Sequence, residues 1–91
     1  MSSRRNRLEV IYDILKAISK DNRKIRKTHI LYKANLSHSL LEEYLDELIE
    51  KEFIDKISDS GKTTYELTQK GFDYLKEYKK IIDFIDSFGL D

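Results

Sequence analysis

The sequence contains no cysteine, no proline and no tryptophan, and only three of its 91 residues are glycine. The absence of cysteine excludes disulfide bonds, thiolate zinc sites and cysteine nucleophiles. Apolar runs are short, as in Ile30-Leu31-Tyr32, whereas a membrane-spanning helix needs about 18 such residues. Arg4 and Arg5 have no apolar run behind them, so we expect no secretory signal, no membrane partner and a cytoplasmic location.

The composition is that of one small globular domain. Hydrophobic residues make up 40% and charged residues 37%, which suits a modest core beneath a strongly charged surface and is too apolar for a disordered chain. The net charge is zero, but residues 1–36 carry ten Lys and Arg against three Asp and Glu, and residues 37–91 carry the opposite excess. The net charge of +7 in residues 1–36 indicates a polyanionic partner, although the same charges would also serve to solvate a surface.

Apolar residues recur at helical spacing in the first half of the chain. They predict a helix from about Arg7 to Lys20, a short second helix capped by Thr28, and a third from about His38 to Lys51 capped by Ser37. Leu8 belongs to the apolar stripe of the first helix. Tyr32 of the second helix is interpreted as a packing residue, with contact to DNA as the alternative. The segment 35–37 between the second and third helices reads as a tight turn.

Two alternating segments follow, at residues 53–58 and 63–67, and turn-forming residues 59–62 join them into a predicted hairpin. Thr68 is expected to cap a last helix that ends near Phe88, before Gly89. The order predicts a mainly α protein with a small β-hairpin, the winged helix-turn-helix. We expect this domain to cover residues 1–68, with residues 69–91 forming a dimerisation helix packed on it.

The stretch from Thr28 to Ser37, and most specifically Tyr32-Lys33-Ala34-Asn35-Leu36-Ser37, resembles the second helix and turn of a family of small archaeal winged-helix DNA-binding proteins. The stretch from Gly61 to Gly71 is similar to its wing and the start of its last helix. The resemblance covers about residues 5–80 and implies chromatin-associated proteins or transcriptional regulators that dimerise through the C-terminal helix.

Basic residues cluster just before the second helix and in the hairpin. We predict phosphate contacts by these residues, because cations and free N–H groups meet at a helix start. The candidates are Arg23, Lys24, Arg26, Lys27, Lys33 and, at the hairpin tip, Lys62. Arg4, Arg5 and Arg7 form a basic arm that would lie along DNA or remain disordered.

The third helix is the element that a helix-turn-helix offers to the major groove, yet its outer face carries Glu42, Glu43, Asp46 and Glu50. Three interpretations remain open. The acids form a solvated face, or only the first turn with Ser37, His38 and Ser39 contacts DNA, or Glu42 accepts a hydrogen bond from a cytosine amino group.

The last helix is too apolar for a helix that buries one side only. A second copy of the chain would cover its exposed residues, and folding back onto the domain is the alternative. The predicted dimerisation residues are Tyr74, Tyr78, Ile81, Ile82, Ile85 and Phe88.

The sequence shows no pattern typical of an enzyme. His29 and His38 lie on separate elements without metal-ligand spacing, and no glycine-rich phosphate loop is present, so we expect no catalysis, metal or cofactor. The predicted function is binding of double-stranded DNA by a homodimeric, nucleoid-associated regulator. The alternative is a protein-binding winged helix that uses its acidic third helix.

Overall fold

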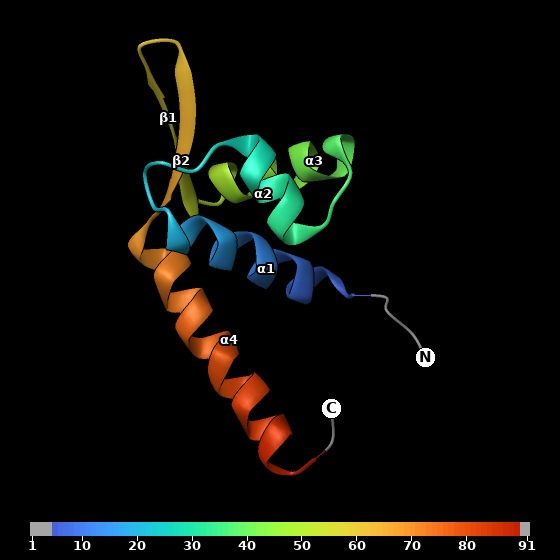
Figure 1. Cartoon of the computed structure of the whole chain (residues 1–91). Helices are drawn as coiled ribbons and strands as arrows, with labels where there is room; N and C mark the ends of the chain where they lie inside the picture. The colour runs from blue at the N-terminus through green and yellow to red at the C-terminus, as the bar shows by residue number, and fades with distance from the viewer. Residues whose placement is uncertain (1–4, 90–91) are drawn as a thin grey trace.

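The computed structural model describes residues 5–89 and contains four helices and a two-stranded antiparallel hairpin within that range (Figure 1). The order is α1 (Arg7–Lys20), α2 (Lys27–Ala34), α3 (His38–Glu50), β1 (Ile54–Asp59), β2 (Lys62–Leu67) and α4 (Gln69–Ser87). The predicted winged helix-turn-helix order is therefore confirmed.

The helix caps follow local chemistry at three of the four starts. The side chains of Asn6, Ser37 and Thr68 each accept a hydrogen bond from a backbone N–H of the first turn. The N-caps predicted at Ser37 and Thr68 are therefore confirmed. The cap predicted at Thr28 is wrong. The N–H groups of His29 and Ile30 already donate to the carbonyl of Arg26, so α2 begins at Lys27.

The core lies where the three N-terminal helices meet the base of the hairpin. Its largest fully buried side chains come from α1, α2, α3, β1 and the segment before α2: Ile14, Leu15, Ile18, Ile25, Ile30, Leu41, Leu45, Leu48 and Ile54. Tyr65 and Leu67 of β2 point into it, while Thr64 and Glu66 point to the other side, as the alternation predicts.

Two residues expected to pack are exposed. Tyr32 is 80% exposed, because it lies on the side of α2 opposite the buried Ile30 and Ala34. Leu8 is 52% exposed, because it lies about 120° around α1 from Ile14, at the edge of the buried stripe.

The turn between α2 and α3 spans residues 35–37, as expected. Asn35 adopts the left-handed conformation at φ 55°, and its N–H donates to the carbonyl of Tyr32 while that of Leu36 donates to the carbonyl of Leu31. Asparagine tolerates this conformation better than most residues, so the chain can end α2 and turn directly into α3.

The start of α4 is packed on the domain, and its remainder extends away from it (Figure 1). Gly71 is buried, and Tyr74 donates a hydrogen bond of 3.0 Å to the carbonyl oxygen of Leu8. The helix ends at Ser87, with Phe88 at the C-cap position and Gly89 at φ 68°.

Candidate nucleic-acid interface

The basic segment before α2 is attached to the hairpin by backbone hydrogen bonds. The N–H of Arg23 donates to the carbonyl of Tyr65 at 3.0 Å, and the N–H of Tyr65 donates to the carbonyl of Ile25 at 3.1 Å. Asn22 accepts a bond from the N–H of Leu67. Ile25 is buried, while Lys24 and Arg26 on either side of it are exposed.

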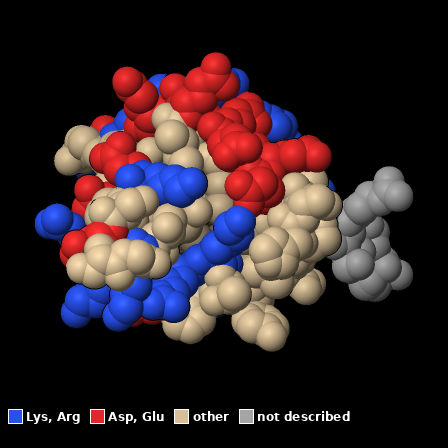
Figure 2. Space-filling view, turned by 90° about the horizontal axis from the view of Figure 1, so that it is seen from above, with Lys and Arg blue, Asp and Glu red and all other residues tan. Residues whose placement is uncertain are grey.

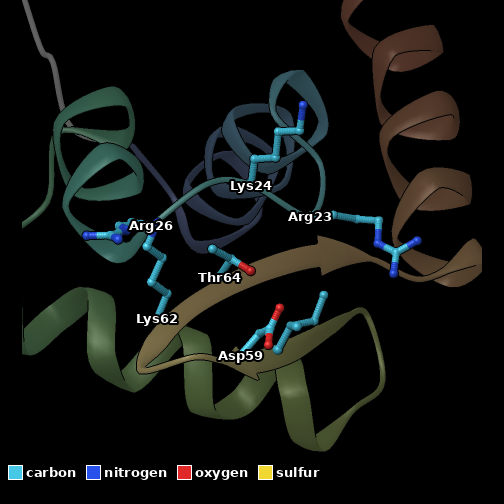
Figure 3. Close-up of a pocket in the computed structure, with 7 residues that line it drawn as sticks. Arg23, Lys24, Arg26, Asp59, Lys62 and Thr64 are labelled. Carbon is cyan, nitrogen blue, oxygen red and sulfur yellow. The ribbon is translucent and has the colours of Figure 1, made fainter.

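A groove of about 380 Å³ lies between this segment and the hairpin, which we call the wing groove. Figure 3 shows Arg26 and Lys62 together at one end and Arg23 at the other, with Asp59 and Thr64 of the hairpin between them. Four cationic side chains line it against one carboxylate: Arg23, Lys24, Arg26 and Lys62 against Asp59. The groove therefore attracts anions.

Some of the basic side chains in this region form ion pairs with acidic residues of the chain, and others do not. Nε of Arg23 lies 3.1 Å from Oε1 of Glu66, and Nζ of Lys27 forms an ion pair with Glu42 of α3. Within residues 5–89, no ion pair involves Lys24, Arg26 or Lys62. Three groove cations are thus available to an external anion.

The ion pair between Lys27 and Glu42 shifts both pKa values. The hydrogen bond to Glu42 raises the pKa of Lys27, and the same bond lowers the pKa of Glu42. Both side chains are therefore charged at neutral pH.

The outer face of α3 is exposed and acidic, as predicted. Glu42, Glu43, Asp46 and Glu50 all lie at the surface, and so do Ser37, His38 and Ser39 at the start of the helix. Seen from above, acidic side chains gather on one part of the surface and basic side chains form a band beside them (Figure 2). Acidic side chains therefore predominate on one part of this face and basic side chains on the part beside it.

Not all the predicted basic residues belong to the wing groove. Lys33 lines a different hollow, of about 250 Å³, together with Lys16 and Lys20 of α1. The expected basic arm is wrong for Arg5 and Arg7: Arg5 forms an ion pair of 2.6 Å with Asp13, and Arg7 pairs with Glu47. Arg4 lies outside the described residues.

Residues 4–86 match the winged helix-turn-helix family over most of the chain. The chain belongs to this family. This winged-helix chain is 33% identical over 84 residues to the protein MJ0290 of the archaeon Methanocaldococcus jannaschii, covering 92% of our chain and 37% of that protein. It therefore spans less than two-fifths of that relative's length.

Solved structures show the same winged-helix fold. Sso10a-2, a DNA-binding protein from Sulfolobus solfataricus, superposes with a TM-score of 0.79 at 23% identity, over 92% of our chain and 85% of that one. F-93 of SSV1 superposes with a TM-score of 0.71 at 20% identity, over 97% of our chain and 95% of that one. The PcaV transcriptional regulator of Streptomyces coelicolor superposes with a TM-score of 0.78 at 17% identity, over 87% of our chain and 60% of that one.

The predicted dimerisation residues divide into two groups. Tyr74 and Tyr78 pack within the winged-helix chain, since Tyr78 contacts Tyr12 with ring centroids 5.0 Å apart and Tyr74 contacts Phe53 at 5.8 Å. Ile82 is half-buried beside Tyr12 and Tyr78. Farther along α4 the apolar residues form an exposed or half-exposed stripe, to which Phe84 also belongs: Ile81, Phe84, Ile85 and Phe88.

Among residues 5–89, no group of three or more His, Asp or Glu side chains is placed to hold a metal ion. No helix in the same range combines the length and the apolarity needed to cross a bilayer.

Proposed function

We propose that this winged-helix protein binds double-stranded DNA as a nucleoid-associated transcriptional regulator or chromatin component, and not as an enzyme. The observation that carries the proposal is the wing groove, in which Lys24, Arg26 and Lys62 have no ion-pair partner among the described residues. Cations that converge on a groove bind successive phosphates along a nucleic-acid backbone.

The fold gives these contacts an orientation on the duplex. In a helix-turn-helix the N-terminal end of the third helix approaches the bases in the major groove. We therefore assign base or phosphate contacts to His38 and Ser39, while Ser37 is the N-cap and its hydroxyl accepts from Leu40. Glu42 remains a candidate acceptor for the cytosine amino group. Lys33 would reach only the flanking backbone.

The charge of the groove predicts a strong dependence on salt. If about six phosphates are neutralised, the logarithm of the affinity should fall with the logarithm of the salt concentration at a slope of about −5. Fluorescence anisotropy with a labelled duplex between about 50 and 200 mM salt measures this slope. An affinity that does not change with salt would contradict the proposal and favour a protein partner for the acidic α3.

We also propose that two copies join through the exposed stripe of α4. Ile81, Phe84, Ile85 and Phe88 follow helical spacing, and the rings of Phe84 and Phe88 contact each other at 5.0 Å. Phe84 and Phe88 are each 64% exposed in the single chain, and an apolar stripe of this kind is covered most simply by its own copy across a two-fold axis.

Replacement of Phe84 by Glu should separate the two copies. The substitution places a charge in the contact on both sides of the axis, and we expect the dimer to weaken by roughly a hundredfold or more, measured by sedimentation equilibrium. Phe72→Glu is the matched control, because Phe72 is also exposed on α4 but lies on the opposite side. Equal effects of both variants, or none from Phe84→Glu, would contradict the proposed dimer.

A further inference from the structure

The acidic and basic surfaces meet at the ion pair between Lys27 and Glu42. Lys27 is the first residue of α2, and its Nζ donates a hydrogen bond to Oε1 of Glu42 in the second turn of α3. A carboxylate of α3 is therefore paired with a cation of the basic stretch that runs into α2.

A carboxylate oxygen and a phosphate oxygen are alternative acceptors for one ammonium group. While Glu42 holds Lys27, this lysine is neutralised and releases no counterion from DNA when the protein binds. For Lys27 to contact a phosphate, Glu42 must first leave it, and the freed carboxylate then faces the duplex together with Asp46. The ion pair therefore weakens any binding that relies only on contacts with the DNA phosphates.

We propose that Glu42 is an internal competitor of the DNA backbone for Lys27 and so sets how weakly the protein holds DNA of arbitrary sequence. This inference rests on the proposed DNA-binding function and adds a determinant of its specificity. Contacts to phosphate carry no sequence information, so a residue that suppresses one of them leaves a larger share of the affinity to base contacts.

The other acids of α3 provide the comparison. Among residues 5–89, no ion pair involves Glu43, Asp46 or Glu50, although each is exposed on the same helix. Glu43 is the closest match, since it is the neighbouring residue, has the same side chain and loses the same charge when it is replaced by Gln.

The test compares Glu42→Gln with Glu43→Gln by fluorescence anisotropy on a random-sequence duplex at several salt concentrations. Both variants remove one negative charge, but only Glu42→Gln frees Lys27. We expect Glu42→Gln to bind roughly two- to fivefold more tightly than Glu43→Gln. Its salt slope should be more negative by about 0.9 per protomer, which corresponds to one additional phosphate contact.

Lys27→Met completes the comparison. In the natural chain this substitution should weaken binding through the uncompensated charge of Glu42 but leave the salt slope unchanged, because no phosphate contact is lost. In the Glu42→Gln chain it should remove the whole gain in slope. Equal affinities and slopes for Glu42→Gln and Glu43→Gln, or weaker binding by Glu42→Gln, would overturn the inference while DNA binding itself stands. Salt-independent binding by the natural chain would instead overturn both. Thermal unfolding checks that the variants remain folded.

Discussion

Reversing the charge of Arg26 and Lys62 together should reduce the affinity for double-stranded DNA by at least roughly a hundredfold near 0.1 M salt. These two residues lie at the same end of the wing groove, one on each side of it (Figure 3). Arg26→Glu with Lys62→Glu removes two phosphate contacts and adds repulsion at the same positions. The salt slope should become shallower by about 1.8 per protomer, as measured by anisotropy or gel shift.

A matched pair of reversals separates the local effect from the change in net charge. Lys76→Glu with Lys80→Glu alters the net charge by the same amount, but both residues are exposed on α4, which does not line the groove. We expect this control to lose only a small part of the affinity. If the two double variants bound DNA equally, the wing groove would not be the contact surface.

Replacement of Gly71 by alanine should destabilise the domain by about 2–4 kcal/mol, although alanine normally favours a helix interior by about 0.5–1 kcal/mol. A Cβ atom at Gly71 would lie 2.3 Å from the carbonyl oxygen of Phe53 and 3.3 Å from Cδ2 of Leu67. The carbonyl oxygen of Phe53 belongs to the backbone and cannot move aside as the end of a flexible side chain can. The start of α4 must therefore shift away from the hairpin to relieve the contact. Urea denaturation followed by circular dichroism measures the loss.

Gly61 at the wing tip offers a control with a different cause. Nothing lies within 4 Å of a Cβ atom there, but its φ of 78° disfavours any other residue. Gly61→Ala should therefore cost about 1–2 kcal/mol through the backbone conformation alone. A neutral or stabilising Gly71→Ala would show that the close approach of α4 to Phe53 does not hold.

The sequence predicts those features that depend on neighbours along the chain. The stripe of Leu41, Leu45 and Leu48 and the caps at Ser37 and Thr68 are local patterns, and each is present. The turn at Asn35 is equally local. These signals suffice for the order of elements and hence for the winged helix, because that fold is defined by its order and its short turn.

Features that depend on contacts between distant segments could not be predicted in this way. The bridge between Ile25 and Tyr65 joins residues 40 positions apart, and a single apolar residue inside a basic stretch gives no signal for it. The ion pairs that hold Arg5 and Arg7 are of the same kind, since their partners Asp13 and Glu47 are unremarkable surface acids in the sequence. Lys33 is a basic residue like those of the wing groove, but it lies in a different hollow beside α1, and residue type alone does not reveal this.

The bonds that attach residues 22–25 to β2 bear on the entropy of binding. Loops that grip a backbone usually become ordered when they bind, and that ordering subtracts from the affinity. Here the main chain of residues 22–25 is fixed against β2 at Tyr65 and Leu67 by the folding of the domain. The segment before α2 therefore keeps its place against the base of β2 when an anion binds, and the ordering that remains is that of the arginine and lysine side chains and of the hairpin tip.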